Sequence, residues 1–250
     1  MTLSAERLHL LLARRPVRYY PQAGSTNDLA REWLRHDGPT GAVVIADEQT
    51  TGRGRKGRGW HNPPGVALAV SVILKPTPDL LPRLSMLGAL AIAELAEAAG
   101  ARNVGIKWPN DVQINGLKVS GVLPEAEWDG GQLIGAVLGM GINVRTDFSG
   151  TELADKAISL ETAVGHRLDR GELVQTLLAR VDDWYRQLDS PALMATWQQR
   201  LVTLGRPVCI GDVEGVAEAV DEQGALLVRD QTGHLQRVVA GDLVMGTETR

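Results

Sequence analysis

The sequence predicts an α+β domain followed by a small antiparallel β-barrel. Strongly apolar runs of strand length alternate with segments of helical period as far as residue 203. From residue 206 onward the pattern changes to short β-type runs, which are separated by turns containing Gly, Asp and Gln. We therefore expect a first domain at residues 1–203 and a second domain at residues 204–250.

The N-terminal elements follow from leucine content and from capping residues. Residues 3–14 carry five leucines before a proline, which predicts a short helix, and residues 17–20 are expected to form a strand. Ser25 or Thr26 has the side chain of an N-cap and predicts a helix over residues 27–36. Hydroxyl groups and free N–H groups at that helix start also suit a carboxylate or carbonyl ligand. Both interpretations of this helix start, a simple N-cap and a ligand site, remain open.

Periodicity predicts the remaining elements. The helix at 82–99 is the clearest, because Leu84, Leu87 and Leu95 fall on one face and Gly100 follows its end. The other elements that we expect in the first domain are strands at 42–48, 66–74 and 133–144 and helices at 172–188 and 191–202. The expected barrel strands are 207–210, 215–220, 225–229, 235–239 and 243–245.

Composition excludes several classes of function. Cys209 is the only cysteine, so internal disulfides and a thiolate zinc site are excluded, and the five histidines lack metal-ligand spacing. The net charge of −4 argues against a general nucleic-acid binder, which usually carries a basic domain. The sequence contains neither an apolar run of membrane-spanning length nor the apolar core of a signal peptide. We therefore expect a cytoplasmic protein without a membrane partner.

The most unusual stretch is residues 52–60, GRGRKGRGW, which we call the basic loop. Its glycines allow positive-φ conformations and let backbone N–H groups approach an anion. Its cations, Arg53, Arg55, Lys56 and Arg58, supply charge for a polyanion. Glycine entropy and like-charge repulsion favour disorder when no ligand is bound. The pattern is compatible with a lid that orders on phosphate and with a solvated, disordered loop.

The basic loop matches known nucleotide-binding motifs only in part. Gly52, Gly54 and Gly57 have G-x-G-x-x-G spacing after a strand, but two prolines follow where a dinucleotide-binding fold needs a helix. No Gly-Lys-Ser/Thr closes the loop as in a P-loop, and the other signatures of protein kinases are missing from the sequence. We therefore reject these three folds.

Residues 107–121, KWPNDVQINGLKVSG, contain the strongest short hairpin signal, an Asn-Gly pair at 115–116. A two-residue turn at that pair predicts the cross-strand pairs Ile114–Leu117, Gln113–Lys118, Val112–Val119 and Asp111–Ser120. In this register Lys118 shares a polar face with Asp111, Gln113 and Ser120 and lies diagonal to Asp111, within reach of a long side chain. The polar face is either a platform that carries one cation or the exposed side of a surface hairpin.

The stretch Gly139-Met140-Gly141-Ile142-Asn143 lies in an otherwise apolar strand. Glycine weakens the interior of a strand, so the two glycines indicate either a bulge or a ligand that lies against the backbone. Asn143 adds an amide that can both donate and accept a hydrogen bond.

These stretches occur together in an order that resembles biotin protein ligases: STN at 25–27, residues 49–60, KWPND at 107–111, Lys118 in LKVSG, and GMGIN at 139–143. The resemblance covers roughly residues 18–203 and the tail at 206–250, which looks like that family's SH3-like module. It implies a mixed β-sheet flanked by helices, similar to class II aminoacyl-tRNA synthetases. Residues 1–16 cannot build a winged helix-turn-helix. The chain thus resembles the single-function form, and we expect neither repressor activity nor specific DNA binding.

The resemblance implies a reaction in two steps, with ATP and biotin as substrates and Mg²⁺ held mainly by the ATP phosphates. Biotin's carboxylate attacks the α-phosphate of ATP, giving biotinyl-5′-AMP and pyrophosphate. A lysine of a biotin carboxyl carrier protein of the acetyl-CoA carboxylase type then displaces AMP. Both steps place negative charge on phosphate oxygens, so positioning and preorganised cations should carry the catalysis. A homodimer is also compatible with the resemblance.

The resemblance also assigns residues. Those expected in catalysis are Lys118, Arg53 and Asp111. Those expected to bind biotin are Ser25, Thr26, Asn27, Gln49, Gly52, Arg53, Gly54, Arg55, Lys118, Gly121, Gly139 and Gly141. Those expected to bind ATP are Arg55, Lys56, Arg58, Trp60, Lys107, Asn110, Asp111 and Asn143. Lys118 should bridge the biotin carboxylate and the α-phosphate, and we expect no dedicated protein site for a metal.

Two other functions stay open. A lipoate-type protein ligase of the same fold also keeps a lysine in its site, but the GRGRKGRG sequence is not expected there. A non-enzymatic nucleic-acid-binding module would use the basic loop and the small barrel. The acidic net charge and the absence of aromatic residues within 52–59 argue against that module.

Overall fold

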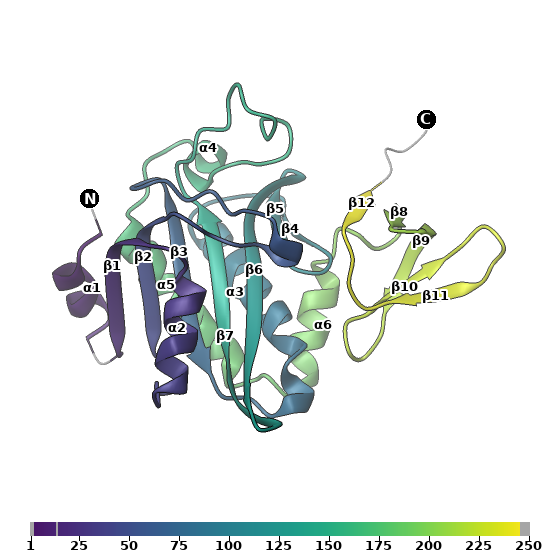
Figure 1. Cartoon of the computed structure of the whole chain (residues 1–250). Coiled ribbons are helices and arrows are strands. Elements are labelled where there is room, and N and C mark those ends of the chain that lie inside the picture. Colours follow the sequence, from purple (N-terminus) through teal and green to yellow (C-terminus); the bar gives the residue numbers. More distant parts are fainter. Residues whose placement is uncertain (1–2, 14, 246–250) are drawn as a thin grey trace.

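The computed structural model describes residues 3–13 and 15–245. The predicted end of the first helix at residue 14, and the ends of the predicted domains at residues 1–2 and 246–250, lie outside the described residues. The described chain forms a large sheet covered by helices, with a smaller sheet on one side of it (Figure 1). No helix of the described part is long and apolar enough to cross a membrane.

In the described residues the large sheet has seven strands in the order β1-β2-β3-β7-β6-β5-β4. β1 is parallel to β2 and every other pair is antiparallel, so the sheet is mixed, as predicted. The strands are β1 (Val17–Ala23), β2 (Val43–Gln49), β3 (Ala67–Leu74), β4 (Val104–Lys107), β5 (Asp111–Ile114), β6 (Leu117–Asp129) and β7 (Gln132–Asn143).

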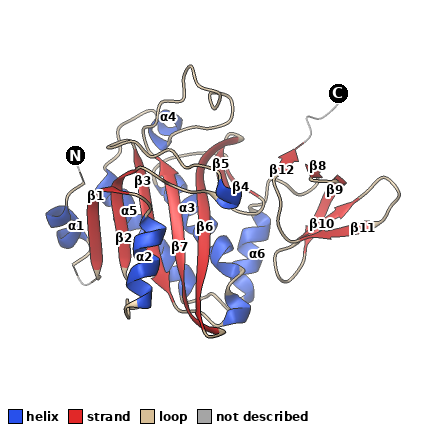
Figure 2. Ribbon diagram, in the orientation of Figure 1, coloured by secondary structure: helices blue, strands red, loops and turns tan. Residues whose placement is uncertain are grey.

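Helices cover both faces of this sheet (Figure 2). They are α1 (Ala5–Leu11), α2 (Thr26–Arg35), α3 (Arg83–Ala98), α4 (Leu160–Val164), α5 (Arg170–Tyr185) and α6 (Pro191–Gln199), together with the 3-10 turns η1 (Arg55–Gly57) and η2 (Pro78–Leu80). All residues of β3 are buried, because a strand alternates its side chains between two covered faces. Leu68, Val70 and Val72 pack into the cluster that contains α3, whereas Ile73 packs with Leu34 of α2.

In the described residues the C-terminal module is an antiparallel sheet of five strands, in the order β11-β10-β9-β8-β12. Its strands are β8 (Pro207–Ile210), β9 (Val213–Val220), β10 (Leu226–Arg229), β11 (Leu235–Val238) and β12 (Leu243–Met245). The module is attached to the large sheet through Trp108. The indole Nε1 of Trp108 donates to Gly224 O of the module at 2.9 Å. The backbone N–H of Trp108 donates at 2.9 Å to Oγ1 of Thr203, the residue just before the module.

The structure confirms the α+β class and each predicted element within a few residues. It adds β4, the far half of β6 and α4, which the sequence analysis does not contain. β4 is too short to show a period, and the far half of β6 carries Pro124 and acidic residues. That half is a strand because it pairs with β7 as far as residue 129, so tertiary context overrides its local composition.

The predicted register of the 107–121 hairpin is wrong beyond its second pair. The observed pairs are Ile114–Leu117, Gln113–Lys118, Val112–Ser120 and Asp111–Gly121. Val119 is the extra residue of a bulge, which shifts the ladder by one. Ser120 therefore turns to the buried face, where its hydroxyl donates to Gly141 O at 2.5 Å. Gly121 instead occupies the place opposite Asp111 that the predicted register gives to Ser120.

Candidate active site

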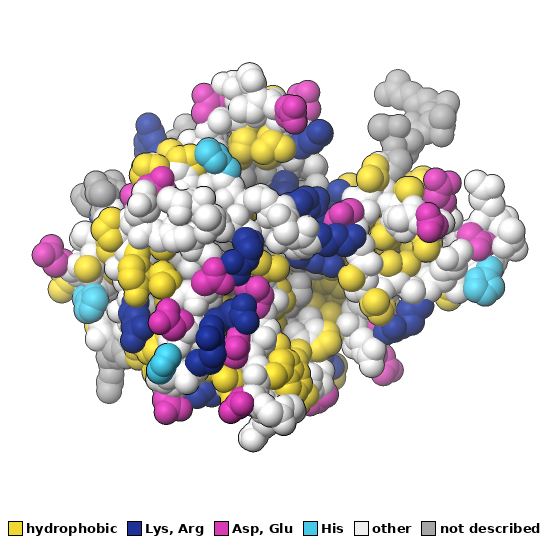
Figure 3. All heavy atoms as spheres, in the orientation of Figure 1, with side chains coloured by type: hydrophobic (Ala, Val, Ile, Leu, Met, Phe, Trp, Pro, Cys, Tyr) yellow, Lys and Arg dark blue, Asp and Glu magenta, His cyan; other side chains and the backbone are white. Residues whose placement is uncertain are grey.

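A cavity of about 470 Å³ lies on the α2 side of the large sheet, over β7, β6 and β5. The start of α2, the basic loop, residues 148–157 and residues 241–243 of the C-terminal module form its walls. Lys and Arg side chains gather where the module meets the rest of the molecule (Figure 3). The cavity is within the usual size range of a small-molecule site.

Most of the predicted site residues line this cavity. They are Ser25, Thr26, Asn27, Gln49, Arg53, Gly54, Arg55, Arg58, Trp60, Lys107, Asn110, Asp111, Lys118, Gly121, Gly139, Gly141 and Asn143. Gly52 and Lys56 do not. A Cβ atom on Gly52 would lie 2.5 Å from Trp60 O, so this glycine allows the loop to fold back on itself. The Lys56 side chain is 55% exposed and its Nζ lies 3.5 Å from Asp242 Oδ2.

One end of the cavity is a neutral hydrogen-bonding wall. Gln49 Oε1 accepts from Thr26 N–H at 2.8 Å and from the Thr26 hydroxyl at 3.0 Å. The hydroxyl of Ser71 is bonded to Thr26 Oγ1 at 2.8 Å and to Asn27 Oδ1 at 2.7 Å. Ser25 occupies the N-cap position of α2, but its side chain makes no capping bond. Donors and acceptors without net charge therefore line this end, which suits a neutral polar ligand group.

The middle of the cavity carries cations. Lys118 Nζ lies 2.7 Å from Asp111 Oδ1, so the predicted diagonal contact is present despite the shifted register. Arg55 NH1 donates to Asn110 Oδ1 at 3.1 Å, and Asn110 Nδ2 donates to Val122 O at 2.5 Å. Burial lowers the pKa of Lys107; Asp111 opposes this shift, and the Lys118 charge adds to it. Burial also lowers the pKa of Arg55. Partly buried cations attract an anion more strongly than exposed ones.

The floor of the cavity is glycine-rich, as GMGIN predicts, but the chain's own side chains lie over three of the glycines. A Cβ atom on Gly139 would lie 2.2 Å from Asn27 Oδ1, and one on Gly141 would lie 2.4 Å from the Trp60 ring. The Lys118–Asp111 pair lies over Gly121, where a Cβ atom would meet Lys118 Nζ at 3.4 Å. The glycines thus let Asn27 and Trp60 sit directly against the sheet.

The basic loop is a small folded turn in this structure. Gly54 N–H donates to Arg58 O at 2.6 Å and Trp60 N–H donates to Gly52 O at 2.8 Å. Lys56 and Gly57 have φ values of 55° and 72°, and this left-handed turn favours glycine at the second position. Disorder of the empty loop stays a prediction.

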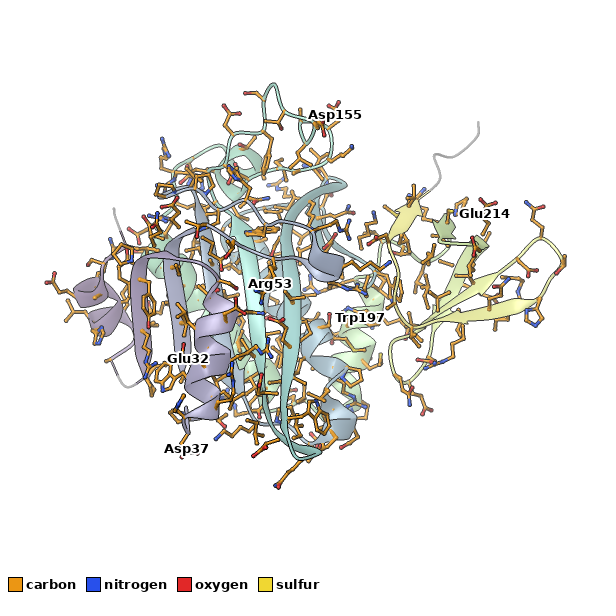
Figure 4. All side chains as sticks on the ribbon, viewed as in Figure 1. Glu32, Asp37, Arg53, Asp155, Trp197 and Glu214 are labelled. Atoms are coloured by element: carbon orange, nitrogen blue, oxygen red, sulfur yellow. The ribbon has the colours of Figure 1, made fainter. Side chains whose placement is uncertain are left out.

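Arg53 is bound to a carboxylate at the mouth of the cavity. Its NH1 and NH2 groups donate to the two oxygens of Asp28, at 2.6 and 2.5 Å, and NH2 lies 3.7 Å from Glu125 Oε1. The hydrogen bonds lower the pKa of Asp28 and raise the pKa of Arg53. Figure 4 shows Arg53 over the sheet beside α2. A ligand that uses this guanidinium competes with Asp28 for it.

The sequence analysis misses several residues that line the cavity or bond to its lining residues. Ser71 is the single hydroxyl in an apolar strand, a pattern that could have marked it. Asp28 and Glu125 carry no such signal. Asp242, which lines the cavity from the C-terminal module and binds Arg58 at 2.5 Å, is far away in sequence. No group of three or more His, Cys, Asp or Glu in the described residues could hold a metal ion.

Two family descriptions match parts of this chain. Residues 19–143 match the Biotin/lipoate A/B protein ligase family, and residues 203–246 match the Biotin protein ligase C terminal domain. The chain is 34% identical over 219 residues to the biotin–[acetyl-CoA-carboxylase] ligase of Paracoccus denitrificans, covering 82% of this chain and 90% of that protein. It is 33% identical over 239 residues to the bifunctional ligase/repressor BirA of Bacillus spizizenii, covering 91% of this chain and 73% of the relative.

A solved structure is also similar. The biotin protein ligase from Aquifex aeolicus in complex with biotin and ATP superposes with a TM-score of 0.79 at 27% sequence identity. The match covers 92% of this chain and 98% of that chain.

Proposed function

This chain belongs to the biotin/lipoate A/B protein ligase family, and from that premise we propose how its residues carry out biotin protein ligation. The chain activates biotin with ATP as biotinyl-5′-AMP and then transfers the biotinyl group to a lysine of a carrier protein. The observation that supports this function best is the combination of a neutral hydrogen-bonding wall and a cluster of partly buried cations in one cavity. Such a cavity accepts a ligand that is neutral and polar at one end and anionic at the other.

In this proposal the ureido ring of biotin lies at the neutral wall. Ser25, Thr26, Asn27 and Gln49 present hydroxyl, amide and backbone N–H groups there, which match a urea that both donates and accepts. The carboxylate of biotin then points along the floor toward Lys118. This orientation brings the anionic end to the cations and keeps the uncharged end away from them.

The adenylation step requires the carboxylate oxygen to bond to the α-phosphorus while the bond to pyrophosphate breaks. Lys118 is held over Gly121 by Asp111, at the middle of the cavity, where its ammonium can contact both reacting anions. Arg55, Arg58 and Lys107 supply further positive charge for the phosphates. These groups bring two anions together and stabilise the charge that moves to pyrophosphate.

The transfer step uses the same cations. The neutral amine of the acceptor lysine attacks the biotinyl carbonyl carbon, the bond from that carbon to the AMP oxygen breaks, and the proton that the amine loses passes to water. Lys118 then stabilises the phosphate oxygen that leaves. The folded basic loop closes one wall of the cavity, so it limits the access of water to the mixed anhydride.

The donor set fits a Mg²⁺ ion that is held chiefly by ATP. Asp111 is a carboxylate in the middle of the cavity, and one of its oxygens already binds Lys118. Mg²⁺ usually takes one or two carboxylates together with substrate phosphates and water. Asp111 would therefore hold the ion from the protein side, and the ion would neutralise phosphate charge.

The remaining proposals concern the setting of the reaction. The carrier is that of acetyl-CoA carboxylase, because the similar Paracoccus protein is named for that substrate. We place the boundary between the ligase domain and the C-terminal module between residues 203 and 204. We also propose that the protein works in the cytoplasm and that two copies of this chain form a dimer.

Exchange of labelled pyrophosphate into ATP by the purified chain tests the assignment. We expect exchange that requires biotin and that lipoate does not support. Exchange with lipoate alone would move the chain to the lipoate branch of the family, and no exchange with either acid would refute the ligase. Labelled biotin should then reach the acetyl-CoA carboxylase carrier but not a carrier whose acceptor lysine is replaced by arginine.

A further inference from the structure

Glu125 does not line the cavity, and neither the sequence motifs nor the proposed mechanism gives it a role. It lies on β6, on the face that carries Gly121 and Leu123, and both of these residues line the cavity. Its Oε2 accepts a hydrogen bond of 2.6 Å from Nδ2 of Asn27, the residue of the neutral wall that lies over Gly139. A carboxylate therefore contacts the neutral wall from the side that faces away from the cavity.

The hydrogen bonds of Asn27 decide which atom of its amide is available to a ligand. An asparagine amide has two N–H donors and an oxygen that can accept twice. Both donors are used, one by Glu125 and the other by the carbonyl oxygen of Leu123 at 3.2 Å. The oxygen accepts from the Ser71 hydroxyl at 2.7 Å and has one acceptor position left. Because Asn27 is buried and lines the cavity, this acceptor position is what it offers to a ligand.

The opposite orientation of the amide is disfavoured chiefly by Glu125. In that orientation the Asn27 oxygen would face Glu125 Oε2 and Leu123 O without a proton between them. A hydrogen bond to a carboxylate is roughly twice as strong as one between neutral groups. The bond to Leu123 is also the longer of the two. Glu125 therefore contributes most to the orientation of Asn27.

Two arginines hold the carboxylate of Glu125. Arg31 NH1 lies 3.9 Å and Arg53 NH2 lies 3.7 Å from Glu125 Oε1. Oε1 thus faces the guanidinium groups of α2 and of the basic loop, while Oε2 binds Asn27. This division of the two oxygens keeps the acceptor for Asn27 in one place.

We propose that Glu125 is a positioning residue for biotin, an inference that rests on the proposed function. It holds the Asn27 amide with the oxygen toward the cavity, where this oxygen accepts a hydrogen bond from a ureido N–H of biotin. The ureido ring is remote from the reacting carboxylate, so this hydrogen bond stabilises bound biotin and the transition state alike. Loss of the orientation therefore raises the KM for biotin and leaves kcat unchanged.

The first test removes the acceptor that Asn27 uses. Glu125→Leu should weaken biotin binding about 10-fold in calorimetry, as expected when a hydrogen bond to a charged group is lost. In biotin-dependent pyrophosphate exchange the KM for biotin should rise by the same factor, with kcat and the KM for ATP unchanged. Glu125→Gln keeps an acceptor for Asn27 and should lose less affinity than Glu125→Leu.

Glu127→Leu is the matched control, because Glu127 lies two residues further along the same face of β6. Its carboxylate accepts from Arg31 Nε at 2.7 Å and lies 3.3 Å from Arg35 Nε, and it does not line the cavity. We expect this variant to bind biotin with wild-type affinity even where its melting temperature falls. Equal weakening of biotin binding in Glu125→Leu and Glu127→Leu would assign the loss to the ion pairs between α2 and β6 and overturn the inference.

A reversed pair separates orientation from packing. In Asn27→Asp two carboxylates face each other, so biotin binding should fall further than in Glu125→Leu. Adding Glu125→Gln gives the carboxylate at position 27 an amide N–H, and its other oxygen can again face the cavity. We expect the double variant to bind biotin about 10-fold more tightly than Asn27→Asp alone, which is the coupling of two residues in direct contact.

The outcomes distinguish the inference from the proposed function. A double variant without recovery, or a Glu125→Leu protein with wild-type affinity for biotin, would overturn the inference while the ligase assignment stands. A wild type that does not bind biotin would instead overturn the proposed function, and the inference with it.

Discussion

The carboxylate of Asp242 binds Arg58 of the basic loop at 2.5 Å, although 184 residues separate the two in the sequence. The other oxygen of Asp242 lies 3.5 Å from Lys56 Nζ. The C-terminal module thereby anchors the loop that the sequence predicts to move. These cations are also the ones that phosphate would attract, so Asp242 and ATP compete for the loop.

Removing this anchor should loosen the loop without unfolding the protein. All three side chains are about half exposed or more, and such pairs contribute at most about 1 kcal/mol each. We predict that Asp242→Asn leaves the melting temperature nearly unchanged, whereas limited proteolysis within residues 53–58 becomes several-fold faster. Biotin with ATP should protect the wild type and the variant alike.

Asp212→Asn is the matched control, since Asp212 is an exposed carboxylate of the same module outside the cavity. It should be cleaved at the wild-type rate. Equal cleavage of Asp242→Asn and the wild type would contradict the anchoring role. Equal cleavage of the wild type with and without ligands would contradict a loop that orders on ATP.

ATP binding should take up a proton at alkaline pH because of Lys107. Burial lowers the pKa of Lys107 in the free protein below the usual value, which is about 10.4. Bound phosphate raises that pKa again. Between these two pKa values, Lys107 is deprotonated in the free protein and protonated in the complex with ATP. The KM for ATP therefore rises with pH in that range. At lower pH Lys107 is protonated in both states, so ATP binding takes up no proton there.

Calorimetry of nonhydrolysable ATP in two buffers with different ionisation enthalpies measures this uptake. Lys107→Arg should abolish it, because arginine stays protonated throughout that range. A wild type without uptake, or an arginine variant with the same uptake, would show that Lys107 does not contact the phosphates.

The buried pair of Arg170 and Asp47 should govern stability rather than activity. Arg170 NH1 contacts Asp47 Oδ1 at 2.5 Å, and the arginine side chain is only 2% exposed. Arg170→Met leaves the Asp47 charge nearly buried and unpaired, so we expect the free energy of unfolding to fall by about 3–5 kcal/mol. Denaturant unfolding measures this loss.

Arg186→Met is the control, because Arg186 pairs with Asp183 at the surface. Arg186→Met should lower the free energy of unfolding by less than about 1 kcal/mol. Adding Asp47→Asn to Arg170→Met should recover part of the loss. A similar cost for both arginines would refute the special role of the buried pair.

A methyl group at Gly139 should damage biotin binding specifically. The new Cβ atom would lie 2.2 Å from Asn27 Oδ1, so Asn27 must leave Ser71 or the strand must shift. We predict that Gly139→Ala weakens biotin binding by at least about 10-fold, the effect of losing about 1.4 kcal/mol. Titration of biotin measures it, and an unchanged dissociation constant would remove Asn27 from the biotin wall.

Local patterns in the sequence predict much of this structure. The Asn115-Gly116 turn predicts the hairpin and the meeting of Lys118 with Asp111, and apolar runs predict β2, β3 and β7. The resemblance to biotin protein ligases is confirmed by the matched family. These features depend on neighbours in the chain or on motifs that keep their order.

Other features depend on contacts that no local pattern encodes. The bulge at Val119 shifts Ser120 away from the cavity, and one extra residue leaves no mark in an alternating sequence. Asp242 reaches the basic loop only because the C-terminal module packs beside Trp108. Glu125 is one acidic residue of a strand until the structure shows its carboxylate bound to Asn27 of the neutral wall.

The central claim is that Lys118, held by Asp111, joins the biotin carboxylate to the α-phosphate. Quenched-flow measurement of biotinyl-5′-AMP in a single turnover, with saturating biotin and ATP, tests it most directly. We predict that Lys118→Ala forms the adenylate at least about 100-fold more slowly than the wild type, as expected when an electrostatic contact of the transition state is lost, while its melting temperature is unchanged. A Lys118→Ala protein that folds normally and forms the adenylate at the wild-type rate would contradict the account.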